Sequence, residues 1–153
     1  MTKLLLTLHV LAAVLTVGPV AVAAGMFPKS LREAAGSPDG GDSAATLRTL
    51  HRICRVYAGV GIAVPVFGFA TASSLGVLGS AWLIVSIVLT LAAAAVLIVG
   101  ILPAQEAALD GVGQAGSPPP SASRLAMVTG AFNLLWAAVT VLMIIRPGTT
   151  TGA

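Results

Sequence analysis

One residue whose type and position suggest chemistry is His9, which lies inside an apolar stretch near the start of the chain. An ionisable side chain within a membrane span points to a function, as a haem ligand, a metal ligand or a proton relay. Met143 has a similar expected depth near the end of the chain, so His9 and Met143 form a candidate cofactor-binding pair with His/Met axial ligation. The structural alternative is a neutral histidine bonded to a neighbouring helix and a methionine that fills apolar space.

A basic cluster precedes and enters another apolar segment. Its members are Arg48, His51, Arg52 and Arg55. Spacings of three and four residues place them on one face of a helix. Such a face at a membrane surface can hold anionic lipid headgroups or another phosphate. The alternative is charge that sets the orientation of the helix and snorkels to the interface. His51 is expected near the opposite membrane face from His9, which disfavours a haem shared by the two histidines.

Polar side chains also occur in the middle of two apolar segments. Asn133 is in the last segment, and Ser86 and Thr90 are one helical turn apart in the third. An amide in hydrocarbon is expected to form a hydrogen bond to another helix. We therefore predict an inter-helix polar contact between Asn133 and the Ser86–Thr90 pair.

The elements that position these residues follow from apolar length. A bilayer core of about 30 Å needs about 20 apolar residues of helix, and the segments that meet this are residues 4–27, 53–76, 81–102 and 125–145. Backbone groups in lipid must bond internally, so each segment is predicted to be a helix. The predicted fold is all-α, an integral membrane antiparallel four-helix bundle over residues 1–147 with a disordered tail at 148–153. Pro19 and Pro65 are expected to bend their helices.

Composition supports a membrane location. Hydrophobic residues make up 57% of the 153 residues and charged residues 8%, with a mean hydropathy of +1.00. A soluble domain has about 25% charged residues. The net charge of +3 comes from only eight Lys and Arg, placed at the ends of apolar segments, so nucleic acid is not an expected partner. Cys54 is the single cysteine, which excludes an internal disulfide.

Charge also predicts orientation. Six of the eight basic residues belong to the first and third loops or their edges: Lys29, Arg32, Arg48, Arg52, Arg55 and Arg124. These loops are therefore predicted to be cytoplasmic, with both termini outside the cell membrane. A competing interpretation is that Lys3, the following apolar stretch and Ala21–Ala23 form a secretory signal, whose cleavage would leave three helices. The length of the stretch, and His9 and Gly18–Pro19 within it, argue against a signal.

Catalytic patterns are not evident. All five acidic residues lie in the expected loops, which disfavours a proton-coupled exporter with a carboxylate inside the membrane. No phosphate-binding glycine loop, HExxH motif or nucleophile elbow occurs in the sequence. The sequence therefore favours a protein that is not an enzyme.

Three short motifs carry a family resemblance. They are Leu8–Ala13 followed by Gly18–Pro19, then Gly79–Trp82, and the closing Leu142–Pro147. Together they resemble a family of small bacterial integral membrane proteins of unknown function, over nearly the whole chain; Arg146 replaces the lysine of that family. The region around His9 is also similar to the copper-resistance D type and protoporphyrinogen-oxidase J type of membrane proteins. That similarity implies haem b or copper at His9, although no second ligand motif matches.

The leading hypothesis is a non-enzymatic accessory membrane protein that contacts lipid and packs against itself or a larger membrane complex. The alternative is a haem- or copper-binding membrane protein that uses His9. A third interpretation is a small transporter gated at Pro19 and Pro65.

Overall fold

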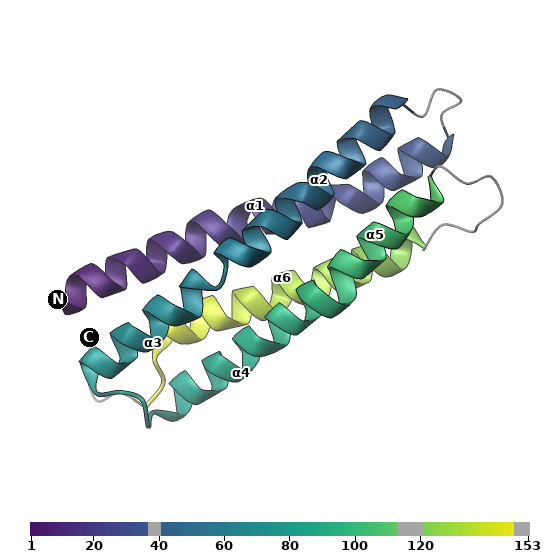
Figure 1. The fold of residues 1–153 in the computed structure, drawn as a ribbon. Coiled ribbons are helices and arrows are strands. Elements are labelled where there is room, and N and C mark those ends of the chain that lie inside the picture. Colours follow the sequence, from purple (N-terminus) through teal and green to yellow (C-terminus); the bar gives the residue numbers. More distant parts are fainter. Residues whose placement is uncertain (37–40, 113–120, 149–153) are drawn as a thin grey trace.

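A computed structural model describes residues 1–36, 41–112 and 121–148 of the chain, and these are almost entirely helical. The elements are α1 (Thr2–Gly36), α2 (Gly41–Val60), α3 (Ala63–Leu75), α4 (Ala81–Ala95), the π-helix η1 (Val96–Ile101), α5 (Leu102–Gly111) and α6 (Ala122–Ile145). The pairs α2–α3 and α4–α5 each form one long rod, so the bundle has four antiparallel rods (Figure 1). The predicted all-α four-helix fold is confirmed.

The surface of the bundle is apolar. Within the described residues, four helical rods are long and apolar enough to cross a membrane: Thr2–Gly36, Asp42–Leu75, Ala81–Gly111 and Ala122–Ile145. Large apolar side chains such as Leu134, Val99 and Ile144 are 73–76% exposed. Exposure of so much apolar surface to water is unfavourable in free energy, whereas contact of the same surface with lipid chains is not. These features fit a multi-pass membrane protein.

The helices are longer than the predicted spans. Helix α1 continues past residue 27 to Gly36, and its 35 residues extend about 52 Å, well beyond a hydrocarbon core of about 30 Å. The third rod likewise continues through Pro103 to Gly111. A prediction from apolar length covers only the part of a helix that faces lipid. It does not include helical residues that pack against one another outside the hydrocarbon core. There the buried core continues with Leu31, Leu47 and Ala108.

Two prolines alter their rods locally. Pro65 has no N–H to offer the Gly61 carbonyl, and α2 and α3 are separated at Gly61–Ile62; the Gly61 carbonyl instead accepts from Val64 N at 3.1 Å. Pro103 cannot bond the carbonyl of residue 99, and the helix widens into η1 just before it. By contrast, α1 runs through Pro19 without interruption, including the Ala21–Ala23 segment.

The loops and the tail lie largely outside the described residues. The residues outside comprise 37–40, 113–120 and residues 149–153 of the predicted 148–153 tail. Helix α6 begins after Ser121, whose hydroxyl oxygen accepts from Arg124 N at 3.3 Å. This is a conventional N-cap and fixes where the fourth rod starts.

Candidate functional sites

His9 attaches α1 to α3. Its Nδ1 lies 2.9 Å from the carbonyl oxygen of Val64. A carbonyl only accepts, so Nδ1 carries the hydrogen and donates, and in the neutral ring Nε2 keeps the free lone pair. Gly68 makes the approach possible, because a Cβ at that position would lie 2.8 Å from His9 Cε1. The contact agrees with the structural alternative for His9.

A second close contact lies one heptad along the same two helices. A Cβ at Gly61 would lie 3.1 Å from Thr16 Cγ2. His9 and Thr16 are seven residues apart on α1, and Gly61 and Gly68 are seven residues apart on the facing rod. Helix α1 therefore approaches the α2–α3 rod closely at two matched points, where a Cβ would collide at Gly68 and would be tightly packed at Gly61.

A small cavity lies near the end of the bundle that holds the start of α1 and the end of α6. Its volume is about 40 Å³, and both His9 and Met143 line it, together with Trp82 and Arg146. About 10–15 Å³ of such space is enough to hold one water, so the cavity has room for a water or a bare ion and is too small for a porphyrin. The structure thus brings the two predicted cofactor-binding residues to one cavity.

The aromatic wall of this cavity is held by α4 and the end of α6. Trp82 is 93% buried, and its Nε1 has no hydrogen-bond partner in the described part of the chain. The Arg146 guanidinium carbon lies 5.7 Å from the centre of the Trp82 ring, within the range of a cation–π contact. Arg146 Nε also donates to the Met143 carbonyl oxygen at 3.3 Å. These contacts fix the end of α6 beside the cavity.

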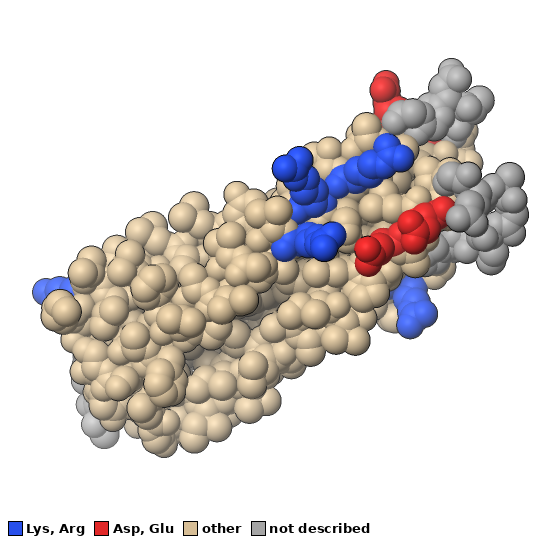
Figure 2. Space-filling view, viewed as in Figure 1, with Lys and Arg blue, Asp and Glu red and all other residues tan. Residues whose placement is uncertain are grey.

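The basic cluster lies toward the other end of the bundle, on α2. Arg48, Arg52 and Arg55 are exposed, and Figure 2 shows Lys and Arg side chains gathered on one face over this helix. His51 is only partly exposed, and its Nδ1 lies 3.1 Å from Gln105 Oε1. The four predicted residues therefore share one helix, with the histidine turned to α5 and the arginines outside.

Gln105 is a residue that sequence reasoning missed. It is fully buried on α5, and its Nε2 donates to Cys54 Sγ at 3.6 Å while its Oε1 faces His51 Nδ1. The available signal was a glutamine two positions after Pro103, in a segment expected to be a loop. In the structure the helix continues through that proline and turns the amide toward α2, where it is buried, and a buried amide needs partners.

The predicted link from Asn133 to Ser86 and Thr90 is not formed. Ser86 Oγ donates to the Trp82 carbonyl at 2.8 Å, and Thr90 Oγ1 donates to the Ser86 carbonyl at 2.7 Å. Both hydroxyls are thus satisfied within their own helix. Asn133 is exposed and has no hydrogen bond to any residue that the structure describes.

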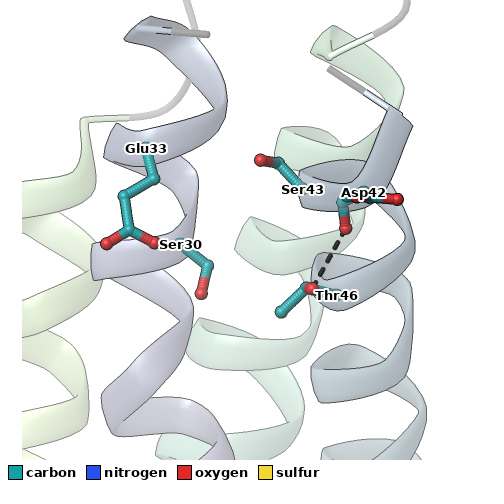
Figure 3. Close-up of a pocket in the computed structure, with 5 residues that line it drawn as sticks. All are labelled: Ser30, Glu33, Asp42, Ser43 and Thr46. Atoms are coloured by element: carbon teal, nitrogen blue, oxygen red, sulfur yellow. Dashed lines mark hydrogen bonds between the residues drawn. The ribbon is translucent and has the colours of Figure 1, made fainter. Parts of the chain in front are cut away.

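An oxygen-lined pocket of about 130 Å³ lies between α1 and α2, away from the termini (Figure 3). Its lining residues are Ser30, Glu33, Asp42, Ser43 and Thr46. Glu33 forms an ion pair with Lys29 at 3.8 Å. Oxygen ligands suit hard cations, but a divalent cation is usually held by more negative charge than one unpaired carboxylate supplies. Among the described residues, no group of three or more His, Cys, Asp or Glu could hold a metal ion.

Comparisons with models of protein families, with curated proteins and with solved structures find no match to the chain. The fold and its apolar rods define a class, that of helical proteins able to cross a membrane four times. The resemblance of three short motifs to a bacterial membrane family of unknown function stays a prediction.

Proposed function

We propose that this chain is a non-enzymatic accessory subunit that assembles with other transmembrane helices through one side of α6. The observation that supports this is Asn133, an exposed amide midway along the 24-residue helix, with no partner in the described residues. Close to it lie fully apolar positions such as Met127 and Leu134, which are 70% and 73% exposed. This depth corresponds to hydrocarbon.

An unpaired amide is unfavourable at such a depth. Protein mutational data put the free energy of burying one without a hydrogen bond at about 1–3 kcal/mol. A helix from another subunit that offers a donor and an acceptor removes this penalty, and inter-helix bonds in membranes contribute about 0.6 kcal/mol on average. Water cannot satisfy the amide in the middle of the bilayer. A helix of another protein chain would supply these hydrogen bonds.

The positions around Asn133 permit such a partner to approach closely. Gly130 and Ala137 lie one helical turn before and after Asn133 on the same side of α6, and Ala126 lies two turns before it. All three are exposed. A Cβ at Gly130 would meet no atom within 4 Å, so this surface is open. Small residues flanking a polar one are typical of transmembrane helix contacts. We call Ala126, Gly130, Asn133 and Ala137 the Asn133 face.

Co-purification from native membranes tests the proposal. The wild-type chain in mild detergent is expected to retain a stoichiometric membrane partner, identified by mass spectrometry as another copy or a different protein. Asn133→Leu is expected to reduce the retained partner about fivefold, equal to about 1 kcal/mol. The matched control is Ala138→Leu, because it introduces the same apolar side chain at an exposed position on another side of the same helix. Equal retention in Asn133→Leu and wild type would contradict the proposal.

A second candidate function is supported by the cavity beside His9. Histidines that bind metals commonly donate their other ring N–H to a backbone carbonyl, as His9 Nδ1 does to Val64. The free Nε2 and the thioether of Met143 are ligands that suit a soft ion such as Cu(I). The size of the cavity favours a bare copper ion over haem b.

Metal analysis and a visible spectrum of the purified protein test this candidate. The expected result is stoichiometric copper without a Soret band, and a loss of copper in Met143→Leu, which conserves volume. Met127→Leu is the control, because Met127 is on the exposed side of the same helix. A metal-free protein after anaerobic loading with Cu(I) would remove this candidate.

A further inference from the structure

We propose that Arg48, Arg52 and Arg55, hereafter the arginine face, bind the phosphate of an anionic phospholipid headgroup, with Gln105 as a positioning residue. This site is separate from the Asn133 face, since it lies on α2 and at a different depth. The group that it binds is a phosphate, which is present both in lipid headgroups and as the free ion. Its surroundings favour the lipid.

The first argument is depth. The exposed side of α2 changes from Arg52 and Arg55 to Val56 and Val60 within two turns, and these valines are 53% and 49% exposed. From Arg55 to Leu75, at the end of α3, the chain advances 20 residues, or about 30 Å of helix. This equals the thickness of the hydrocarbon core of about 30 Å. Arg55 therefore lies at headgroup level when Leu75 lies at the opposite surface.

The second argument is unneutralised charge. Within the described residues, the arginines of this face form no ion pair, and the one salt bridge is Lys29–Glu33. Two exposed carboxylates on α5, Glu106 and Asp110, lie beyond 4.0 Å of these guanidinium groups. Figure 2 shows the basic side chains as a group over α2, with acidic side chains only beside it. A guanidinium can bind a phosphate through two parallel N–H bonds, so free arginines at this depth suit it.

The third argument is rigidity. His51 lies between the arginines in sequence, and its Nδ1 donates to Oε1 of the fully buried Gln105. Gln105 Nε2 in turn donates to Cys54 Sγ, one residue before Arg55. The amide thus holds α2 against α5 at the level of the arginine face. Fixing the helix beforehand lowers the entropy lost when the phosphate is bound.

The apolar surface below the arginines identifies the lipid as the ligand. Val56 and Val60, one and two turns beyond Arg52, expose apolar surface on the membrane side of the arginines, where acyl chains lie. A free phosphate would use only the arginines, whereas a phospholipid uses both surfaces. Electrostatic attraction of anionic lipid to basic residues contributes at this interface as well.

Native mass spectrometry of the full chain, released from nanodiscs that contain phosphatidylcholine with a minor fraction of phosphatidylglycerol, tests the site. The readout is the ratio of anionic to zwitterionic lipid retained. The triple variant Arg48→Gln/Arg52→Gln/Arg55→Gln is expected to lower this ratio about tenfold, equal to about 1.4 kcal/mol. The control Lys29→Gln/Arg32→Gln/Arg124→Gln removes the same charge from exposed residues at the same end and is expected to leave the ratio unchanged.

Gln105→Met keeps the arginines and removes the contact to His51. It is expected to lower the same ratio about threefold, equal to about 0.65 kcal/mol. A purely structural role would reduce retention of both lipids together and leave their ratio unchanged. A ratio in the triple variant equal to that of wild type, or an equal loss in the control, would overturn the site. Displacement of phosphatidylglycerol by an equal concentration of inorganic phosphate would overturn the assignment to lipid.

Discussion

His9 Nδ1 donates a hydrogen bond to the carbonyl oxygen of Val64, 55 positions away, across 2.9 Å. Val64 is the residue before Pro65, next to the interruption between α2 and α3. The side chain that looked most like a cofactor ligand is therefore also the tether that holds α1 on a broken helix. The tether and the metal ligand are compatible, because they use different nitrogens of one ring.

Removal of the tether should destabilise the bundle. His9→Ala loses the hydrogen bond and part of the packing on Gly68, with an expected destabilisation of about 1–3 kcal/mol. Thermal unfolding in detergent measures the change as a lower midpoint. Thr7→Val is the control, because the exposed Thr7 hydroxyl bonds only the Lys3 carbonyl of its own helix. An unfolding midpoint of His9→Ala equal to that of wild type would show that the hydrogen bond does not contribute to stability.

Gly68→Ala should destabilise the protein through the same contact. The added Cβ would lie 2.8 Å from His9 Cε1, and overpacking of this kind costs about 1–3 kcal/mol. Gly25→Ala is the matched control, since a Cβ there meets nothing within 4 Å and alanine favours the helix.

The double variant His9→Ala/Gly68→Ala isolates the contact. With the ring removed, the added methyl has space, so the two losses should be less than additive by about 0.5–3 kcal/mol. The measurement is the set of four unfolding midpoints in one detergent. Strict additivity would mean that Gly68 is needed for a reason other than His9.

Loss of the Gln105 amide should act outside the membrane core. Gln105→Leu removes the hydrogen bond to the partly exposed His51, and such a bond contributes about 0.5–1.5 kcal/mol to stability. Hydrogen exchange should therefore increase in α5 and in the first half of α2, while α3 and α4 keep their protection. Uniform exchange along all helices would contradict a local role.

The sequence predicted the parts of this structure that depend on apolar length. The four segments of about 20 apolar residues form four helical rods. In lipid a single segment can satisfy its backbone hydrogen bonds only as a helix. Pro65 was likewise expected to bend its helix, because a missing N–H acts on its own helix, and the rod is interrupted just before it. Pro19 carried the same expectation, yet α1 continues through it without interruption. The extension of α1 to Gly36 was not visible, because helix outside the membrane follows packing rather than a run of apolar residues.

Contacts between helices could not be predicted from the sequence. Ser86, Thr90 and Asn133 have suitable types and depths, yet the rotation of each helix about its axis decides which side chains meet. Ser86 is fully buried while Asn133 faces outward. The partner of His51 could not be predicted for a similar reason, because Gln105 was assigned to a loop.

Lipid accessibility at two neighbouring alanines tests most directly whether a partner helix covers the Asn133 face. Ala137 belongs to that face, and Ala138 is exposed on another side of α6, about 100° around the helix. Nitroxide labels are introduced at Ala137→Cys or Ala138→Cys in a Cys54→Ser background, and their oxygen accessibility is measured in native membranes. The account predicts a label at position 137 that is protected relative to one at position 138, and loss of this protection in Asn133→Leu. Equal and high accessibility at both positions would show that α6 meets lipid on all its outer sides and would contradict the proposed assembly.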